Sequence, residues 1–324
     1  MNNKRLLIVD QNNQFIRSYM AVPTISETTG KHIGGIVGTF KILQKICKEV
    51  FPDEIIICWD GIEGSQRRRA KYSEYKKNRK PIRLNRNIQN MTEEEEENNK
   101  LWQMVRLMEY FNEFPVQQFM VEYVEADDVV AYATNSTHYK DWQKVILSSD
   151  KDFVQLLDSK TILYRPVAKE ILNRNKAIEK FGIHPNNFAM AKAITGDLSD
   201  NIGGVKGLGF KRLSTCLPFL EKENTFLLED IIEYCSTHIN NSKFYRLIIE
   251  QKELIENNYS LMQLHNPMIS SCNREKIDYS FGNFVPRFNK TKTLLMLSKD
   301  GINNSIDLTT LFQTFRRMIY NKTH

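Results

Sequence analysis

Aspartates stand directly after three short apolar runs of this chain. Each run is rich in Ile, Val or Leu and lacks strict alternation, which predicts strands of a parallel sheet covered on both faces. The runs are Leu6–Val9, Ile55–Trp59 and Lys144–Ser148. The aspartates that follow them are Asp10, Asp60, Asp150 and Asp152. Because sites in open α/β sheets form at the carboxyl ends of the strands, these carboxylates converge if the strands are neighbours.

Two further acidic clusters lie outside these runs. Glu125, Asp127 and Asp128 precede an apolar stretch, which is typical of a helix start, and Glu125 and Asp128 are spaced to share one helix face. Asp197 and Asp200 form the other cluster. Each acid taken alone has a structural explanation, since aspartates often cap helices or occupy turns and the Glu125 group could be a capping device.

The coincidence of all these carboxylates favours a metal site. Nine acids in one cleft would repel each other, and several would stay protonated unless cations intervened. Mg²⁺ is a hard ion that takes oxygen ligands, and two such ions about 4 Å apart can activate water and steady the leaving oxygen of a phosphodiester. The candidate ligands are Asp10, Asp60, Glu125, Asp127, Asp128, Asp150, Asp152, Asp197 and Asp200.

A glycine-rich turn follows the last acidic cluster. Residues 201–209 hold four of the chain's fourteen glycines, a pattern similar to a helix–hairpin–helix element. Glycines let the backbone approach a phosphate, and free amides at the next helix start bind it without reading sequence. An ordinary loop between helices is the alternative, and a P-loop is excluded because its motif does not occur. The candidate duplex contacts are Gly204, Lys206, Gly207, Gly209, Lys211 and Arg212.

A basic stretch begins a few residues after Asp60. Ten basic residues and one acid, Glu74, lie between Arg67 and Arg86. Cations hold phosphates and tyrosines stack on unpaired bases, although a charge run is usually just a solvated face. Its candidate nucleic-acid contacts are Arg67, Arg68, Arg69, Lys71, Tyr75 and Lys77. The five glutamates of 93–97 that follow are either solvated and disordered or paired with this stretch, and we favour the first reading.

The remaining pattern indicates an α/β fold. Helical periodicity in Gly38–Val50 and Leu101–Phe114 separates the predicted strands. The polar segment Tyr72–Asn99 predicts a mobile excursion from the core. Thr161–Arg165 is a further strand candidate that pairs with Ala168–Leu172. Helices dominate afterwards, with a helix stop and restart at residues 182–185.

Bulk composition sets broad limits. The 324 residues suggest one large domain or two modest ones, and 41% hydrophobic residues suffice for a core. No apolar run approaches the roughly 20 residues of a membrane span, and the start lacks signal-peptide features, so we expect a cytoplasmic protein, in a bacterial host if phage-encoded. The net charge of +6 is compatible with a nucleic-acid partner. Five scattered cysteines without a Cys-x-x-Cys pair make a zinc site improbable.

Several strings together point to one family. They are Leu7-Ile8-Val9-Asp10 with Arg17 downstream, Trp59-Asp60-Gly61 leading to Glu74-Tyr75-Lys76-Lys77-Asn78-Arg79, Glu125-Ala126-Asp127-Asp128, Ser149-Asp150-Lys151-Asp152, and Gly196-Asp197 through Gly209. Their order and spacing resemble the 5′ nuclease superfamily of flap endonucleases, polymerase-associated 5′ exonucleases and T-even-type phage ribonuclease H, the last most of all. The resemblance covers roughly residues 6–217.

The resemblance implies a PIN-like nuclease core with a mostly parallel sheet over residues 1–180, with a helical arch over about 67–112. It implies a helix–three-turn–helix duplex clamp and helical remainder over 181–324. By position, Asp10, Asp60, Glu125, Asp127 and Asp128 match the first metal cluster and Asp150, Asp152, Asp197 and Asp200 the second. Lys76 and Arg79 match the arch cations at the scissile phosphate, and Asp128 joins them as a catalytic candidate. Arg17 joins the DNA contacts.

The resemblance also implies cofactors and partners. These are two Mg²⁺, with Mn²⁺ as a substitute, and K⁺ held by the hairpin's backbone carbonyls. The substrate would be duplex DNA with a 5′ flap, nick or RNA primer, cut by a monomer that aids replication. Gln11, where the family often has Gly, and Phe210-Lys211-Arg212 depart from the family pattern in turn and clamp details. The rivals are a non-catalytic DNA-binding replication subunit and a PIN-type single-strand ribonuclease.

The C-terminal segment leaves an alternative open. Residues 308–312 with Arg316 and Arg317 could bind a sliding clamp or a single-strand-binding protein. The other reading, which we favour, is that they are ordinary faces of a helix.

Overall fold

The computed structural model describes residues 4–79, 91–303 and 305–323. These residues form a six-stranded sheet in the order β3-β2-β1-β4-β5-β6, in which β6 alone runs antiparallel to its neighbour. The strands are β1 (Arg5–Asp10), β2 (Glu54–Trp59), β3 (Gln117–Met120), β4 (Gln143–Leu147), β5 (Thr161–Arg165) and β6 (Glu170–Leu172). The predicted α/β class and the strands that were expected are confirmed. In register, Val9 lies opposite Ile57 and Leu147, so the carboxyl ends of β1, β2 and β4 are level.

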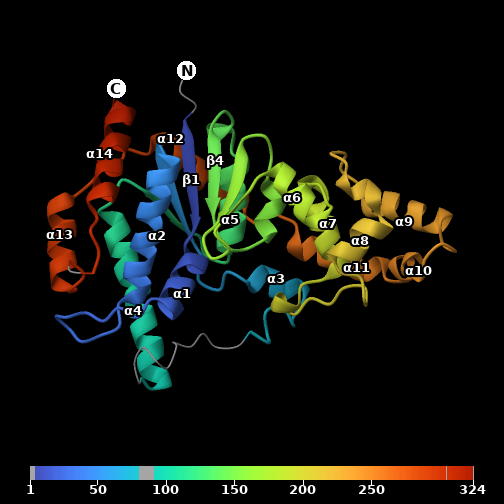
Figure 1. The fold of residues 1–324 in the computed structure, drawn as a ribbon, viewed down its shortest axis with the longest axis horizontal. Helices are drawn as coiled ribbons and strands as arrows, with labels where there is room; N and C mark the ends of the chain where they lie inside the picture. The colour runs from blue at the N-terminus through green and yellow to red at the C-terminus, as the bar shows by residue number, and fades with distance from the viewer. Residues whose placement is uncertain (1–3, 80–90, 304, 324) are drawn as a thin grey trace.

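Helices bury both faces of the sheet, which explains why its strands lack polar alternation. Leu7 and Val9 point to one face, whereas Leu6 and Ile8 point to the other. The first face is covered by α1 (Gln11–Ala21), α2 (Gly34–Val50), α4 (Glu93–Asn112), α13 (Lys290–Lys299) and α14 (Thr309–Thr323). The second is covered by α5 (Ala126–Asn135), α7 (Pro185–Thr195) and α12 (Ser271–Asn283). Figure 1 shows α2 and α14 packed side by side.

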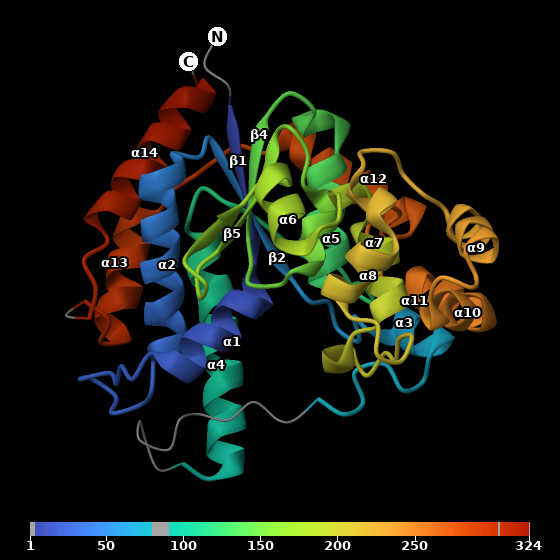
Figure 2. The same cartoon turned by 45° about the vertical axis from the view of Figure 1, so that its right-hand side comes forward.

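A helical region extends the second face away from the sheet. Figures 1 and 2 both place it on the side opposite α13 and α14. Its elements are α6 (Arg174–Phe181), α8 (Phe210–Cys216), α9 (Leu228–Thr237), α10 (Lys243–Glu250) and α11 (Lys252–Met262). The predicted stop and restart are confirmed, since Gly182 ends α6 in the left-handed conformation and Pro185 begins α7. Although α13 and α14 lie beyond residue 181, they pack on the first face of the sheet.

Short 3₁₀ helices complete the described secondary structure. They are η1 (Thr137–Tyr139), η2 (Asp152–Leu156), η3 (Leu198–Asp200) and η4 (Pro218–Glu221). No helix among residues 4–79, 91–303 and 305–323 is both long and apolar enough to span a membrane. In α14, Leu311 and Phe312 are buried in the core, which supports an ordinary helix face there.

Two sequence expectations were wrong. Helix α4 begins at Glu93 instead of Leu101, because Thr92 and Glu95 form a capping box and acids favour the positive end of the helix dipole. The five glutamates are therefore a helical turn, not a disordered run. Strand β3 was missed because its first two residues are glutamines. Of the predicted mobile excursion over Tyr72–Asn99, which α3 (Gln66–Lys71) precedes, residues 80–90 lie outside the described residues. The described parts do not all stand off the core, since Tyr75 and Asn99 are buried.

Candidate active site

Asp10 anchors the site at the end of β1. One carboxylate oxygen caps α1 by accepting from the Asn13 amide at 3.2 Å, and the other accepts from the Ser148 hydroxyl at 2.7 Å. The same hydroxyl accepts from the Asp150 amide at 3.0 Å and so ties the ends of β1 and β4 together. Burial, together with the smaller effects of the Asp60 and Asp150 charges, raises the pKa of Asp10 to about 7, although the hydrogen bond from Ser148 acts to lower it. Asp10 is both a helix cap and a member of an acidic cluster.

Asp127 and Asp60 extend this cluster across β2 and α5. Burial raises the pKa of Asp127 well above its ordinary value, with contributions from the charges of Asp10 and Asp150. Asp60 accepts from the Ala126 amide at 2.8 Å and from the Asn12 side chain at 2.9 Å, which fixes its carboxylate beside the start of α5. The predicted convergence is therefore seen for the strand-end acids Asp10, Asp60 and Asp150, and Asp127 joins them from α5.

Asp128 was predicted as a metal ligand and catalytic residue, but the structure places it elsewhere. Its carboxylate is fully buried and accepts from the Arg68 guanidinium at 2.6 Å and from the Met268 amide at 2.8 Å. Glu125 also accepts from Arg68, at 2.9 Å. The shared helix face of Glu125 and Asp128 thus faces an internal arginine, and Asp127 is the α5 residue that faces the other aspartates.

Glu125 links this internal arginine to the basic stretch. It accepts from Lys76 Nζ at 2.5 Å and from the Tyr75 hydroxyl at 3.0 Å. Burial alone would raise the pKa of Glu125, but Lys76 and Arg68 outweigh burial and hold the pKa below its ordinary value. Lys76 has a left-handed backbone (φ 56°), and its amide donates to the Asp200 carbonyl at 2.9 Å. Glu125 is therefore a neutralised acid at the rim of the cluster.

The second acidic group is held by a cation that the sequence interpretation missed. Lys192 on α7 is almost completely buried, and its ammonium contacts Asp152 and Asp197, the latter at 2.7 Å. Burial raises the pKa of Asp152 to about 7, and the Asp150 charge adds to this effect. Burial also acts to raise the pKa of Asp197, but Lys192 and Ser199 lower it to about 2. A lone lysine amid the apolar residues of a core helix was the available signal.

Arg79 pairs with Asp200, the remaining member of the second acidic group. Its guanidinium donates to Asp200 Oδ1 at 2.5 Å, and Asn78 donates to the Asn201 side chain at 3.0 Å. With Lys76, these contacts join the basic stretch to both acidic groups. Beside these contacts lies a cavity of about 780 Å³ whose lining includes Asp60, Arg69, Lys76, Lys77, Arg79 and Glu125. We call this cavity the catalytic groove.

The predicted DNA contacts of the N-terminal half divide into exposed and buried residues. Arg17, Arg69, Lys71 and Lys77 are exposed. Arg68 and Tyr75 are buried, each about 4% exposed, so neither is available to DNA in this structure. Their side chains hold Glu125 instead, which corrects those two assignments. Arg67 lines a different cavity.

The glycine-rich turn forms an exposed hairpin between α7 and α8. Gly204 packs so closely on α7 that an added Cβ would lie 2.2 Å from the Thr195 carbonyl carbon. Gly207 has a left-handed backbone (φ 80°), and Arg212 donates to its carbonyl at 2.5 Å. Gly209 immediately precedes α8, and Lys206 and Lys211 are exposed beside it. The hairpin thus presents backbone and cations to solvent, while Gly204 serves packing.

The carboxylates fit a hard cation in chemistry but do not already form a cage. Among the described parts of the chain, no three carboxylate, imidazole or thiol groups are arranged to hold one ion. Asp10 is buried, whereas Asp127 and Asp152 are half-buried, and all three combine oxygen donors with raised pKa values. A divalent cation would favour their ionised forms and offset their repulsion.

Comparisons with known proteins agree on the kind of fold. Residues 5–182 match the family model described as 5′-3′ exonuclease, N-terminal resolvase-like domain. A 5′-3′ exonuclease of Aquifex aeolicus is 27% identical, over 90% of this chain and 91% of the relative. DNA polymerase I of Bacillus subtilis is 28% identical over 71% of this chain, which spans only 25% of that polymerase.

Solved structures give the same result for the fold. T5 5′-exonuclease with bound zinc ions superposes with a TM-score of 0.69 at 22% identity, over 87% of this chain and 99% of that one. A bacteriophage T5 flap endonuclease in a pseudo-enzyme-product complex with DNA and metal ions gives a TM-score of 0.65 at 21% identity, over 91% of this chain and 100% of that one. At these identities the likeness concerns the fold, and the PIN-like core is confirmed.

Proposed function

Because this chain belongs to the 5′-3′ exonuclease family and is a nuclease, we propose that it is a Mg²⁺-dependent, structure-specific 5′ nuclease. Its substrate is duplex DNA that carries a 5′ flap, a nick or an RNA primer, and its role is the removal of flaps and primers during replication. The relatives' names support the 5′-3′ polarity, and the T5 structures were determined with metal ions and DNA. Primer removal of the ribonuclease H kind is the finer part of this proposal.

The convergence of acids at the strand ends is the observation that carries the proposal. Asp10, Asp127 and Asp150 come from β1, α5 and the end of β4, yet the charges of Asp10 and Asp150 raise the pKa of Asp127, and the charge of Asp150 raises the pKa of Asp10. A fold has little reason to gather buried and half-buried carboxylates around each other unless a cation completes the site.

Two Mg²⁺ ions would be held by acids of the centre, with Asp197 joining them from the rim. Asp10, Asp60 and Asp127 would hold one ion, and Asp150, Asp152 and Asp197 the other, with Mn²⁺ as a substitute. When bound, the ions supply an activated water and neutralise charge on the leaving oxygen. Oxygen donors of this kind suit Mg²⁺ better than a softer metal.

Lys76 and Arg79 supply the charge that meets the scissile phosphate. Both now pair with rim acids, Glu125 and Asp200, at 2.5 Å. A phosphate that enters the catalytic groove competes for these cations, which then stabilise the negative charge that grows on it. Arg68 keeps Glu125 partly neutralised when Lys76 turns to the phosphate.

The hairpin binds the duplex at a distance from the scissile phosphate. The exposed amides near Gly207 and Gly209 and the side chains of Lys206 and Lys211 bind phosphates without reading sequence. Its backbone carbonyls are the proposed K⁺ ligands. Asn258 fixes the hairpin by donating to the Gly203 carbonyl at 2.7 Å.

A cleavage assay tests the proposal. The double variant Asp150→Asn with Asp152→Asn should lose cleavage of a labelled 5′-flap duplex in Mg²⁺ but retain binding of that duplex. Asp141→Asn is the matched control, because Asp141 is exposed and precedes β4 at the opposite end of the sheet. Wild-type cleavage by the double variant would refute the metal assignment.

The same assay separates the rivals. A non-catalytic DNA-binding subunit would bind the flap duplex without cutting it in any divalent metal. A single-strand ribonuclease of the PIN kind would cut single-stranded RNA faster than the flap duplex. Faster cutting of the flap or RNA-primed duplex supports the proposed function.

A further inference from the structure

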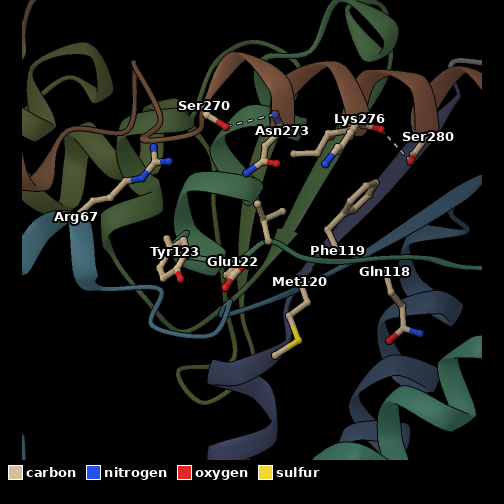
Figure 3. Close-up of a pocket in the computed structure, with 12 residues that line it drawn as sticks. Arg67, Gln118, Phe119, Met120, Glu122, Tyr123, Ser270, Asn273, Lys276 and Ser280 are labelled. Carbon is tan, nitrogen blue, oxygen red and sulfur yellow. Dashed lines mark hydrogen bonds between the residues drawn. The ribbon is translucent and has the colours of Figure 1, made fainter.

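A second cavity lies behind the catalytic groove, between α12 and the end of β3. Its volume is about 590 Å³, and its lining includes Arg67, Met120, Glu122, Tyr123, Asn273 and Lys276. Figure 3 shows Asn273 and Lys276 pointing from α12 toward the segment that carries Glu122 and Tyr123, with Arg67 at one end. None of the residues that line this cavity also lines the catalytic groove.

One short helix serves both cavities. Arg69 of α3 lines the catalytic groove, and Arg67, two residues earlier, lines the second cavity and donates to the Met268 carbonyl at 2.7 Å. Arg68 between them is buried against Glu125 and Asp128. Residues two apart on a helix project to different sides, so α3 carries a cation into each cavity while its middle arginine fixes it in place.

Two turns that touch each other contribute lining residues to the two cavities, one to each. The Gly61 amide donates to the Val124 carbonyl, and the Tyr123 amide donates to the Ile62 carbonyl, both at 2.9 Å. A Cβ added to Gly61 would lie 1.7 Å from the Val121 carbonyl oxygen, so these turns are in backbone contact. The segments that line the two cavities are therefore in direct backbone contact, which places the second cavity next to the catalytic groove.

The second cavity and the turn beside it combine exposed apolar side chains with cations. Ile62 is 66% exposed, Met120 50% and Tyr123 37%. Tyr123 also has a left-handed backbone (φ 61°), which is uncommon for a large side chain and holds the ring at the surface. The nearby Glu122 raises the pKa of the Tyr123 hydroxyl, so the two side chains lie close together. Stacking surfaces beside cations are what unpaired nucleotides need.

We propose that this second cavity binds nucleotides of the substrate's single-stranded 5′ side, beyond the scissile phosphate. Arg67 and Lys276 contact phosphates, and the Tyr123 ring with Met120 supports a base. The proposal rests on the proposed function, because that function supplies a single strand next to the catalytic groove. A peptide that pairs as an added strand with the edge of β3 is the competing occupant. It is the weaker choice, because pairing of this kind uses main-chain hydrogen bonds and gives no role to the cations of the cavity.

Flap-length dependence of binding tests this inference. Fluorescence anisotropy would measure the Kd of flap duplexes with a one-nucleotide or a ten-nucleotide 5′ flap. Tyr123→Asn removes the ring and suits the left-handed backbone, and Lys276→Gln removes a cation. Each should raise the Kd of the long-flap duplex about fivefold and leave the short-flap Kd unchanged. Lys48→Gln, on exposed α2 surface, is the control.

The outcomes separate this inference from the proposed function. Equal effects on both flap lengths, or none, would overturn it, and no effect is also what a peptide site predicts. Binding does not require cleavage, so a length-dependent loss remains measurable even if the protein cuts nothing. Photo-crosslinking of a flap that carries 5-iodouracil gives a second measurement. A crosslink on residues 119–123 supports the site, and crosslinks confined to other surfaces contradict it.

Discussion

The centre and the rim of the acidic site differ in how their charges are balanced. At the centre, Asp10 and Asp127 face other carboxylates, and their pKa values are raised. At the rim, Glu125 faces Lys76 and Arg68, and Asp197 faces Lys192. The pKa values of both acids are lowered. The rim is thus neutralised by the protein itself, whereas the centre needs an external cation. Metal binding should therefore matter at the centre, whereas a mutation at the rim should mainly destabilise the fold.

The largest expected effect separates activity from stability at the centre. Asp10→Asn should lower Mg²⁺-dependent cleavage of a flap duplex by about a thousandfold, since several kcal/mol of charge stabilisation would be lost. The same change should raise the melting temperature in EDTA, because it removes a buried charge that other acids repel. Cleavage rates and thermal unfolding of one preparation measure both. A variant that loses stability in EDTA as well as activity would break the distinction between centre and rim.

At the rim the expected effect falls on stability. Arg68→Met should lower the free energy of unfolding by about 3 kcal/mol or more, because it leaves Asp128 buried without its counter-charge and Glu125 with Lys76 alone. Urea denaturation measures the loss. Arg69→Met is the matched control on the next residue of α3, and because Arg69 is exposed it should change the unfolding free energy by less than about 0.5 kcal/mol. Equal losses in the two variants would show that Asp128 does not depend on Arg68.

The sequence predicted the centre better than the rim, for a physical reason. Parallel strands end at one edge of a sheet, so the aspartates after β1, β2 and β4 had to converge once the strands were neighbours. The role of Asp128 could not be predicted in this way, because it depends on an arginine sixty residues away that turns inward. A helical spacing shows which residues share a face but not what that face meets.

Lys192 and β3 were missed for related reasons. Lys192 pairs with Asp152 only because α7 packs on η2, a contact between segments forty residues apart. Strand β3 has little apolar pattern, and its place at the edge of the sheet comes from pairing with β2. The α4 start, in contrast, was readable, since Thr92 and Glu95 form a local capping box that the glutamate run obscured. Local signals can be read from sequence, whereas pairings across the chain need the fold.

The smallest expected effect is a pH dependence that tracks the centre. Because the folded pKa of Asp10 is about 7, above its ordinary value of 3.8, the folded protein binds a proton that the unfolded chain releases. The contribution of Asp10 to stability in EDTA is therefore fully present below about pH 4, and it is lost as pH rises through 7. Asp152, also raised to about 7, adds in the same direction.

Thermal unfolding between pH 5 and 8, with EDTA or with Mg²⁺, measures this dependence. The melting temperature in EDTA should fall across that range, and Mg²⁺ should remove most of the fall because a bound cation favours the ionised acids. Asp10→Asn should flatten the EDTA curve, since amide replaces the titrating group. A curve that is the same with EDTA and Mg²⁺ would mean that the central acids are balanced within the protein, as those of the rim are, and that the contrast between the two regions does not hold.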